Sequence, residues 1–415
     1  MNTEWNIVAG WTARGVVMLL AFVNTRLLIE TVGADGLAAY VIIISLTPWL
    51  ALLNLGLPIT IQNSISVSRG GEGACVAIRD QSFGTMIVQA LILFPITLII
   101  AWITHQFLLV NYPFVSMGAV VGVHMFIYIT GICQLLIHVM YAQHEALWPN
   151  IYPAFAPLWT TATLAIALYF NIEKFDLVIL IVAASNILMP IHAARRLKIF
   201  SKAIINIHAI REQLSDSKHQ MIFATMSAAT LSIDYVIMSR ILTHLDIVEY
   251  NLTSRIFLTL TVVYGVVLAT NWTPIADLMH SGKKLEARKR VERVLKQGLL
   301  IAFGSGFLIM VVIDDLAKLL SGGTIKIVPI GLGIAFWIYI LLRVWTDTFA
   351  MAVQGFGLVS EINKFIPLQA LISIISQYFL GSQFGPTGII LGLIISFLLT
   401  ASWIIPRKFY SITRE

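Results

Sequence analysis

The chain is dominated by apolar runs of about 20 residues, the length that crosses the hydrocarbon core of a bilayer as one helix. Hydrophobic residues make up 58% of the chain and charged residues 12%, against roughly 45–50% and about 25% in soluble domains. A soluble protein of this composition could not cover its surface with polar groups, whereas lipid tails solvate apolar side chains. The sequence therefore predicts an integral membrane protein.

The predicted fold class is an all-α integral membrane protein with about 12 transmembrane helices, since backbone polar groups in hydrocarbon must be satisfied within each segment. The apolar runs are separated by Gly, Pro and clusters of charge. The predicted helices cover residues 5–29, 37–64, 82–104, 114–140, 151–170, 176–193, 220–242, 247–276, 297–314, 327–352, 365–380 and 387–406.

Lysine and arginine predict the orientation of these helices. If both termini are cytoplasmic, the inner connections hold 19 of the 27 basic residues, the outer connections hold 3, and 5 lie within helices. Positive charge accumulates on the cytoplasmic side of membrane proteins. We therefore expect a multi-pass membrane protein with both termini in the cytoplasm.

The longest inner connection divides the chain into two halves of six helices. Residues 194–219 combine isoleucines with basic residues, a pattern typical of an amphipathic surface helix lying on an anionic leaflet. The expected domains are an N-terminal six-helix bundle (1–193), a cytoplasmic amphipathic linker (194–219) and a C-terminal six-helix bundle (220–415). Arg26, Asp35 and Tyr40 in the first half have counterparts in Arg240, Asp246 and Tyr250 in the second, which indicates two parallel repeats of the kind found in transporters.

The sequence contains no recognisable catalytic motif. It lacks a phosphate-binding glycine loop, a serine nucleophile elbow and a Cys/His pattern with metal-ligand spacing. The two cysteines, Cys75 and Cys133, do not indicate a disulfide framework. His124, His138 and His192 are scattered singly and are interpreted as packing or interface residues. These observations favour a transporter over an enzyme, with no metal site.

Charged residues inside apolar helices are the strongest candidates for function, because each costs about 2.5–3.5 kcal/mol at the bilayer centre. Arg14 and Arg255 are too deep to reach the headgroups easily, and Asp234 lies in the outer half of its helix. Arg26 and Arg240, near outer helix ends, either face the cargo or extend to the headgroups. Arg343 and Asp347 are spaced i, i+4, so they form either a structural ion pair or part of the site.

The sign of these charges predicts the cargo. Five arginines against two aspartates leave an excess of three positive charges, which would attract an anion, and the guanidinium fork suits phosphate. Asn54 and Asn271 add amides that could bind hydroxyls, although buried amides also bridge helices. The sequence leaves open whether Asp234 carries a coupling proton or balances an arginine.

Two segments near the N-terminus carry a resemblance to a known family. The stretch from Arg26 to Tyr40 (RLLIETVGADGLAAY) and the LNLGL stretch from Leu53 to Leu57 resemble the opening of O-antigen flippases of the Wzx type. These belong to the polysaccharide transport family of the multidrug/oligosaccharidyl-lipid/polysaccharide exporter superfamily. The resemblance extends through Gln143 and Pro274 to Gln354.

The resemblance implies a V-shaped, MATE-like exporter fold of two six-helix bundles around a cationic central cavity. The implied function is translocation of undecaprenyl-pyrophosphate-linked O-antigen repeat units from the cytoplasmic to the periplasmic leaflet of the bacterial inner membrane. The resemblance implies that this occurs by alternating access, as a step of lipopolysaccharide biosynthesis. The implied partners are that lipid-linked oligosaccharide, membrane lipids and other O-antigen assembly proteins, such as the polymerase and the chain-length regulator. No cofactor is implied beyond coupling to protons or sodium.

Two alternatives differ in what they require of the sequence. A cation-coupled multidrug exporter of the same superfamily calls for buried carboxylates, and the middle of the first helix has none. A membrane O-antigen polymerase or ligase calls for a large periplasmic loop, whereas the predicted outer connections are short.

Overall fold

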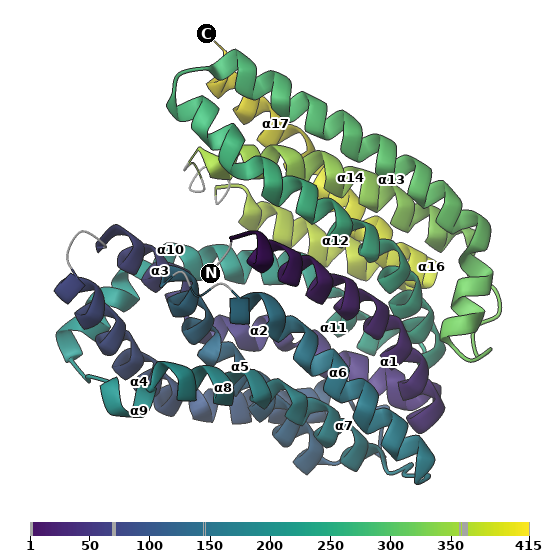
Figure 1. Ribbon diagram of the computed structural model, residues 1–415. Helices are drawn as coiled ribbons and strands as arrows, with labels where there is room; N and C mark the ends of the chain where they lie inside the picture. The colour runs from purple at the N-terminus through teal and green to yellow at the C-terminus, as the bar shows by residue number, and fades with distance from the viewer. Residues whose placement is uncertain are drawn as a thin grey trace. The chain divides into compact units, whose positions relative to one another are not determined.

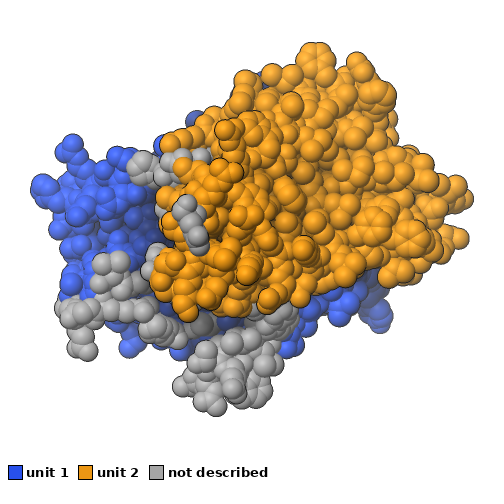
Figure 2. Space-filling view, turned by 90° about the horizontal axis from the view of Figure 1, so that it is seen from above, with its two compact units in different colours: residues 1–225 blue, residues 226–415 orange. Residues whose placement is uncertain are grey.

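The computed structural model describes residues 3–68, 72–143, 145, 147–356, 358 and 364–414, and over these residues its regular structure is entirely helical. The chain forms two compact units, Met1–Thr225 and Met226–Glu415 (Figure 2). The helix α10 (Ile207–Leu231) begins in the first unit and ends in the second. The division at residues 193 and 219 expected from the sequence stays a prediction.

The first unit consists of long helices connected by short helical turns (Figure 1). In chain order they are α1 (Thr3–Ser45), α2 (Thr47–Ala51), η1 (Leu52–Asn54), α3 (Leu57–Val67), α4 (Glu72–Ile103), η3 (Thr104–Leu108), α5 (Met117–Ala142), α6 (Leu147–Tyr169), α7 (Phe175–Ala184), η4 (Ser185–Ile187), α8 (Leu188–Leu197) and α9 (Ile199–Lys202). The helix α5 packs against α2, α3, α4, α7 and α8, so it is the central element of this unit.

The second unit contains α11 (Asp234–Ile241), α12 (His244–His280), α13 (Lys284–Leu320), α14 (Ile330–Gly355), α16 (Ile366–Leu399) and α17 (Ala401–Ile412). The helices α12, α13 and α14 pack against one another, and α14 also packs against α16 and α17 (Figure 1). The central position of α14 places its charged residues, Arg343 and Asp347, within reach of several neighbours.

Two of the long helices are hairpins that reverse at a glycine. In α1 the break is at Gly33 (φ 74°), and in α16 it is at Gly385 (φ 59°). Both values lie in the left-handed region, which glycine enters without the steric penalty of a side chain. The loop expected between residues 29 and 37 is therefore a much tighter turn.

The observed spans agree with the predicted helix number. Nine described stretches are long and apolar enough to cross a membrane. Two of these stretches each consist of two helices, because they break at Gly33 and Gly385. The 37-residue helix α12 is long enough for one more crossing. Large apolar side chains are exposed on the helix surfaces, as Leu300 of α13 is (75% exposed). The prediction of about 12 transmembrane helices is confirmed.

The structure differs from the sequence prediction in two connections that were predicted to be cytoplasmic. The basic stretch before residue 297 was expected to be a loop, but α13 already begins at Lys284. Residues 194–219 are not one helix, because Lys198 adopts a left-handed conformation and the chain leaves helix after Lys202. Asn206 then caps α10 by accepting hydrogen bonds from the N–H groups of His208 (2.9 Å) and Ala209 (3.3 Å).

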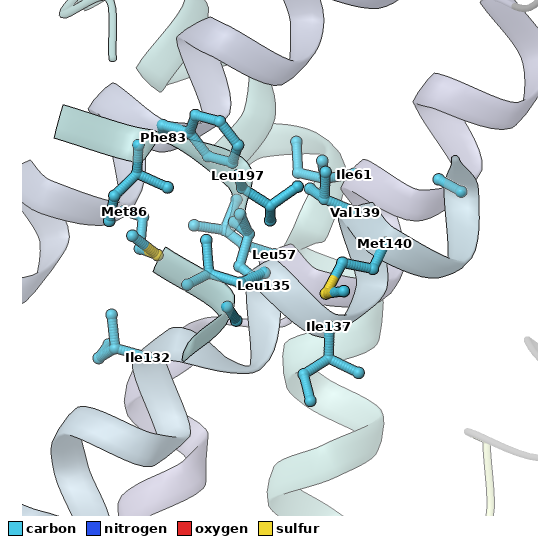
Figure 3. Close-up of a cluster of buried hydrophobic side chains, with 14 of the residues drawn as sticks. Leu57, Ile61, Phe83, Met86, Ile132, Leu135, Ile137, Val139, Met140 and Leu197 are labelled. Atoms are coloured by element: carbon cyan, nitrogen blue, oxygen red, sulfur yellow. The ribbon is translucent and has the colours of Figure 1, made fainter. Parts of the chain in front are cut away.

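A hydrophobic cluster holds the first unit together at the end where α3, α5 and α8 meet (Figure 3). Leu57, Ile61, Leu135 and Leu136 are almost completely buried in it. Phe83 contributes the largest of its fully buried side chains from α4. Because helix surfaces facing lipid gain nothing from apolar burial, close packing of this kind is what gives the unit a unique arrangement.

The connection after α9 depends on a glycine of α4. The N–H of Ile204 donates to the carbonyl of Asp80 (2.9 Å). A Cβ atom built on Gly84 would lie 2.1 Å from the carbonyl oxygen of Ile204, so only glycine allows this approach. The chain therefore crosses α4 with backbone against backbone.

We predict that Gly84→Ala lowers the free energy of unfolding by about 1–3 kcal/mol, because the connection must move away from α4. Gly304→Ala on α13 is the matched control, since its Cβ would meet no atom within 4 Å and alanine favours helix. Thermal unfolding of the detergent-solubilised protein measures both. Equal melting temperatures for the two variants would contradict the close approach.

Candidate functional site

Asp234 lies at the start of α11, and its carboxylate is held between two helices. The N–H of Tyr235 donates to Oδ1 (2.9 Å), and the Tyr250 hydroxyl of α12 donates to Oδ2 (3.0 Å). The Asn251 amide donates to the Tyr235 hydroxyl (2.7 Å). The carboxylate predicted to lie inside the membrane is thus fixed by a polar network that joins α11 to α12.

Arg255 lies one helical turn after Asn251 on α12 and is half-buried. The charges of Asp234 and Arg255 both act on Tyr235. The structure therefore brings two of the predicted site residues, Asp234 and Arg255, close to the same tyrosine. Sequence spacing could not show this, because the two residues come from different helices.

Arg343 and Asp347 form the ion pair that their i, i+4 spacing predicted. Arg343 Nη2 lies 2.9 Å from Asp347 Oδ2, and Nε donates to both carboxylate oxygens. Arg343 also donates to the Tyr339 hydroxyl (3.0 Å), and its guanidinium lies 5.9 Å from the centre of the Phe397 ring. The pair is partly buried, with side-chain exposures of 22% and 32%, and it is held from α14 and α16.

Tyr339 connects this ion pair to the carboxylate on α11. Its hydroxyl is bonded to Arg343, and the charge of Asp234 also acts on it. Asp234, Tyr250, Tyr339, Arg343 and Asp347 thus form a polar strip across α11, α12 and α14. A polar strip of this kind within a transmembrane bundle is typical of an ion or substrate pathway.

The arginines near the predicted outer helix ends are exposed. Arg26 forms an ion pair with Glu30 at 2.8 Å, with side-chain exposures of 44% and 39%. Glu30 was not considered as its partner from the sequence, although the i, i+4 spacing was visible. Arg240 lies in the last turn of α11. Exposure near a helix end agrees with extension toward the headgroups. A role of Arg26 and Arg240 in binding cargo stays a prediction.

Arg14 lies on α1 with an exposed side chain. Its charge acts on Tyr141 at the end of α5. Arg14 and Arg26 are 12 residues apart on the first helix of α1, which corresponds to about 18 Å along the axis. The two arginines of this helix therefore cannot bind one phosphate group together.

The two asparagines have local roles. Asn54 Oδ1 accepts from the Gly56 N–H (2.9 Å), in the turn where Leu55 and Gly56 are left-handed. Asn271 donates to the Val267 carbonyl, and its Oδ1 accepts from Arg290 Nε (3.1 Å). Asn54 thus stabilises the break before α3, and Asn271 connects α12 to α13. Their assignment to cargo hydroxyls stays a prediction.

The first unit contains two adjoining cavities that were not predicted. Their volumes are about 280 and 480 Å³, and both are lined by Thr130, Gln134 and Asn186. We call them together the α5 chamber. Its further lining residues are Tyr40, Ile44, Thr47, Ala51, Val123, Ile127, Gly131, Ile137, His138, Tyr141, Pro149, Tyr152, Pro153, Phe155, Ala156, Ala183, Ser185 and Met189.

The polar residues of α5 could have indicated the chamber. Thr130, Gln134, His138 and Tyr141 are spaced three or four residues apart, so they share one face of the helix. Charge alone does not reveal this uncharged polar stripe. His138, which was predicted to be a packing residue, is one of its members.

The chain is similar to known proteins in its sequence and in its fold. No family model matches the chain. It is 26% identical over 425 residues to a protein of Yersinia pseudotuberculosis whose name assigns it, provisionally, to O-antigen export, with 97% of this chain and 94% of the relative covered. A Salmonella typhi protein named in the same provisional way as an O-antigen transporter is 24% identical, with 96% and 94% covered. The resemblance to O-antigen transporters is confirmed.

Solved structures show the same fold. The lipid II flippase MurJ, in an inward closed conformation, has a TM-score of 0.77 at 14% identity, with 99% of this chain and 90% of that chain covered. A multidrug resistance MATE transporter of the MOP superfamily, inward-facing, has a TM-score of 0.72 at 12% identity, with 98% of both chains covered. The predicted exporter fold is confirmed, and the names of the relatives confirm a transporter rather than an enzyme.

We predict that Arg343→Met destabilises the protein by about 1–3 kcal/mol, because Asp347 then loses hydrogen bonds to a charged partner. The double variant Arg343→Met, Asp347→Leu should recover most of this loss, since no lone charge remains. The exposed pair offers a control: Arg26→Met should cost less than about 1 kcal/mol. Thermal unfolding in detergent measures all three variants, and a double variant as unstable as the single one would argue against a structural pair.

Proposed function

We propose that the protein flips undecaprenyl-pyrophosphate-linked O-antigen repeat units from the cytoplasmic to the periplasmic leaflet of the bacterial inner membrane. The observation that carries the proposal is the similarity over nearly the whole chain to relatives named for O-antigen export and transport. The fold shared with a lipid II flippase supports it, because that protein by its name moves a lipid-linked cargo.

The anionic part of the cargo would bind to arginines that lie within the predicted transmembrane helices, where a retained charge indicates a function. Arg26 and Arg343 each have a carboxylate partner within 3 Å. Arg14 is exposed and Arg255 is half-buried, each beside a tyrosine on which its charge acts. Because guanidinium donates two parallel hydrogen bonds to phosphate oxygens, Arg14 and Arg255 are the proposed pyrophosphate ligands.

Alternating access between the two halves would move the cargo across the membrane. In this proposal six helices on each side of the 194–219 connection rock around a cationic central cavity, with both termini in the cytoplasm. The basic first turns of α13, which include Lys284, Arg288 and Arg290, support that orientation through the positive-inside rule.

Ion coupling is proposed at the polar strip of the second unit. Asp234 is a carboxylate within a candidate span, and its oxygens are oriented by Tyr235 and Tyr250. Intramembrane carboxylates of this kind carry protons or bind sodium in transporters. Asp234 would accordingly link a cation gradient to the movement of the anionic cargo.

A multidrug exporter is the second candidate, and the fold shared with MATE transporters favours it. A cationic drug would need carboxylates that are free to pair with it. Asp347 is bonded to Arg343, whereas Asp234 is bonded only to neutral groups in the contacts described above. Resistance to cationic drugs on overexpression would favour this candidate over the flippase.

We predict that Arg14→Ala and Arg255→Ala each reduce surface display of O-antigen about tenfold or more in a strain lacking its own flippase, because each loses charge-assisted hydrogen bonds of about 1.5–3 kcal/mol. Lys318→Ala, an exposed cation in the last turn of α13, is the matched control and should display like wild type. Quantitative immunoblotting at equal membrane expression provides the measurement. Wild-type display by both arginine variants would remove them from the site.

A further inference from the structure

The α5 chamber in the first unit has the properties of a ligand site. It takes no part in the proposed binding of pyrophosphate or of a coupling ion. Its larger cavity, about 480 Å³, lies within the range of roughly 300–1,000 Å³ that is usual for small-molecule sites. It is lined by residues of α5, α6, η4 and α8, so its described walls belong to one compact unit. Rigid helical walls of this kind can hold polar groups in fixed positions.

The walls of the chamber are polar but uncharged. Among the residues that the structure describes, none of those lining the chamber is Asp, Glu, Lys or Arg. The polar groups are instead hydroxyls, amides and an imidazole, with Gln134 and Asn186 facing both cavities. A phosphate or a drug cation would meet no oppositely charged side chain among these described lining residues, whereas a neutral molecule with many hydroxyls would find both donors and acceptors.

Prolines of α6 add acceptors from the backbone. Proline has no N–H, so Pro153 and Pro157 leave the carbonyls of Pro149 and Pro153 without their usual helical donors. Pro149 and Pro153 both line the larger cavity. A carbonyl that lacks its helical donor can accept from another group, and the hydroxyl of a ligand in the chamber can donate to it.

Aromatic rings form another part of the wall. Tyr152 and Phe155 contact each other edge to face at 5.9 Å, and Tyr141 lies on the α5 side of the same cavity. The Tyr152 hydroxyl is bonded to His192 Nδ1 (2.7 Å), which fixes the ring. Fixed aromatic rings present apolar faces between polar edges, and the ring of a sugar has the complementary pattern of C–H faces and hydroxyl edges.

We infer that the α5 chamber binds uncharged sugar residues of the cargo, separately from the groups that bind its pyrophosphate. This inference rests on the proposed function and specifies where the oligosaccharide is recognised. Arg14 acts electrostatically on Tyr141, which lines the chamber. A pyrophosphate held by Arg14 would therefore place the first sugars beside the chamber, and Gln134 is the residue that contacts them from the centre of the stripe.

The test compares two probes on the purified full-length protein in nanodiscs: undecaprenyl pyrophosphate alone, and the same lipid carrying the repeat unit from the strain used for surface display. We expect Gln134→Leu to weaken binding of the sugar-bearing lipid about tenfold, the effect of losing one or two hydrogen bonds. Binding of the sugar-free lipid should stay within about twofold of wild type, because the variant keeps the contacts to the pyrophosphate and to the lipid. Gln106→Leu, an exposed glutamine of η3 outside the chamber, is the matched control.

A second variant fills the chamber without removing a hydrogen-bonding group. Ala156→Phe places a ring in the larger cavity and should likewise weaken only the sugar-bearing lipid. Arg14→Ala should weaken both probes. Binding of the sugar-free lipid also reports that each variant is folded.

The outcomes separate the inference from the proposed function. If wild type binds both probes but Gln134→Leu and Ala156→Phe change them equally or leave both unchanged, the chamber does not bind sugar while the flippase proposal survives. If wild type binds the sugar-free lipid as tightly as the loaded one, the sugars are not recognised and the inference fails. If wild type binds neither probe, the proposed function itself fails and the inference fails with it.

Discussion

The structure depends on one constraint: backbone N–H and C=O groups within hydrocarbon must find their partners inside the protein. Long helices meet this constraint, and α1 and α16 break at Gly33 and Gly385, where glycine permits a left-handed conformation. Side-chain hydroxyls follow the same rule. Thr25, Thr31 and Thr104 each donate to the carbonyl four residues earlier in their own helix, so they satisfy themselves locally and leave helix surfaces apolar.

The same constraint explains how the protein keeps charge inside its helices. Arg343 is acceptable because Asp347 and Tyr339 satisfy it, and Asp234 is acceptable because Tyr235 and Tyr250 donate to it. An excess of three positive charges counted from the sequence is therefore not an excess of three free cations. The arginines proposed to bind cargo, Arg14 and Arg255, each lie beside a tyrosine on which their charge acts.

The proposed recognition of cargo divides between two kinds of group. Guanidinium groups suit the pyrophosphate because charge and fork geometry match it, while the α5 chamber suits sugars because it is polar without charge. Such a division would let one protein hold an invariant anion strongly and discriminate among sugars by weaker, geometry-dependent hydrogen bonds. A buried polar group left unpaired by the wrong sugar is the source of that discrimination.

The sequence by itself determined that lipid surrounds the protein, about how many helices cross the membrane, and that Arg343 pairs with Asp347. Each of these follows from composition or from spacing along one helix. Only the tertiary structure decided which helix faces which. It joined Asp234 and Arg255 at Tyr235, engaged Asn271 with Arg290, and assembled the α5 chamber from residues up to 149 positions apart, Tyr40 and Met189. In lipid, apolar periodicity does not specify the inward face of a helix, because lipid tails and a neighbouring helix are equally apolar. Contacts between small residues and polar groups make that choice, and they become visible only when the helices are packed together.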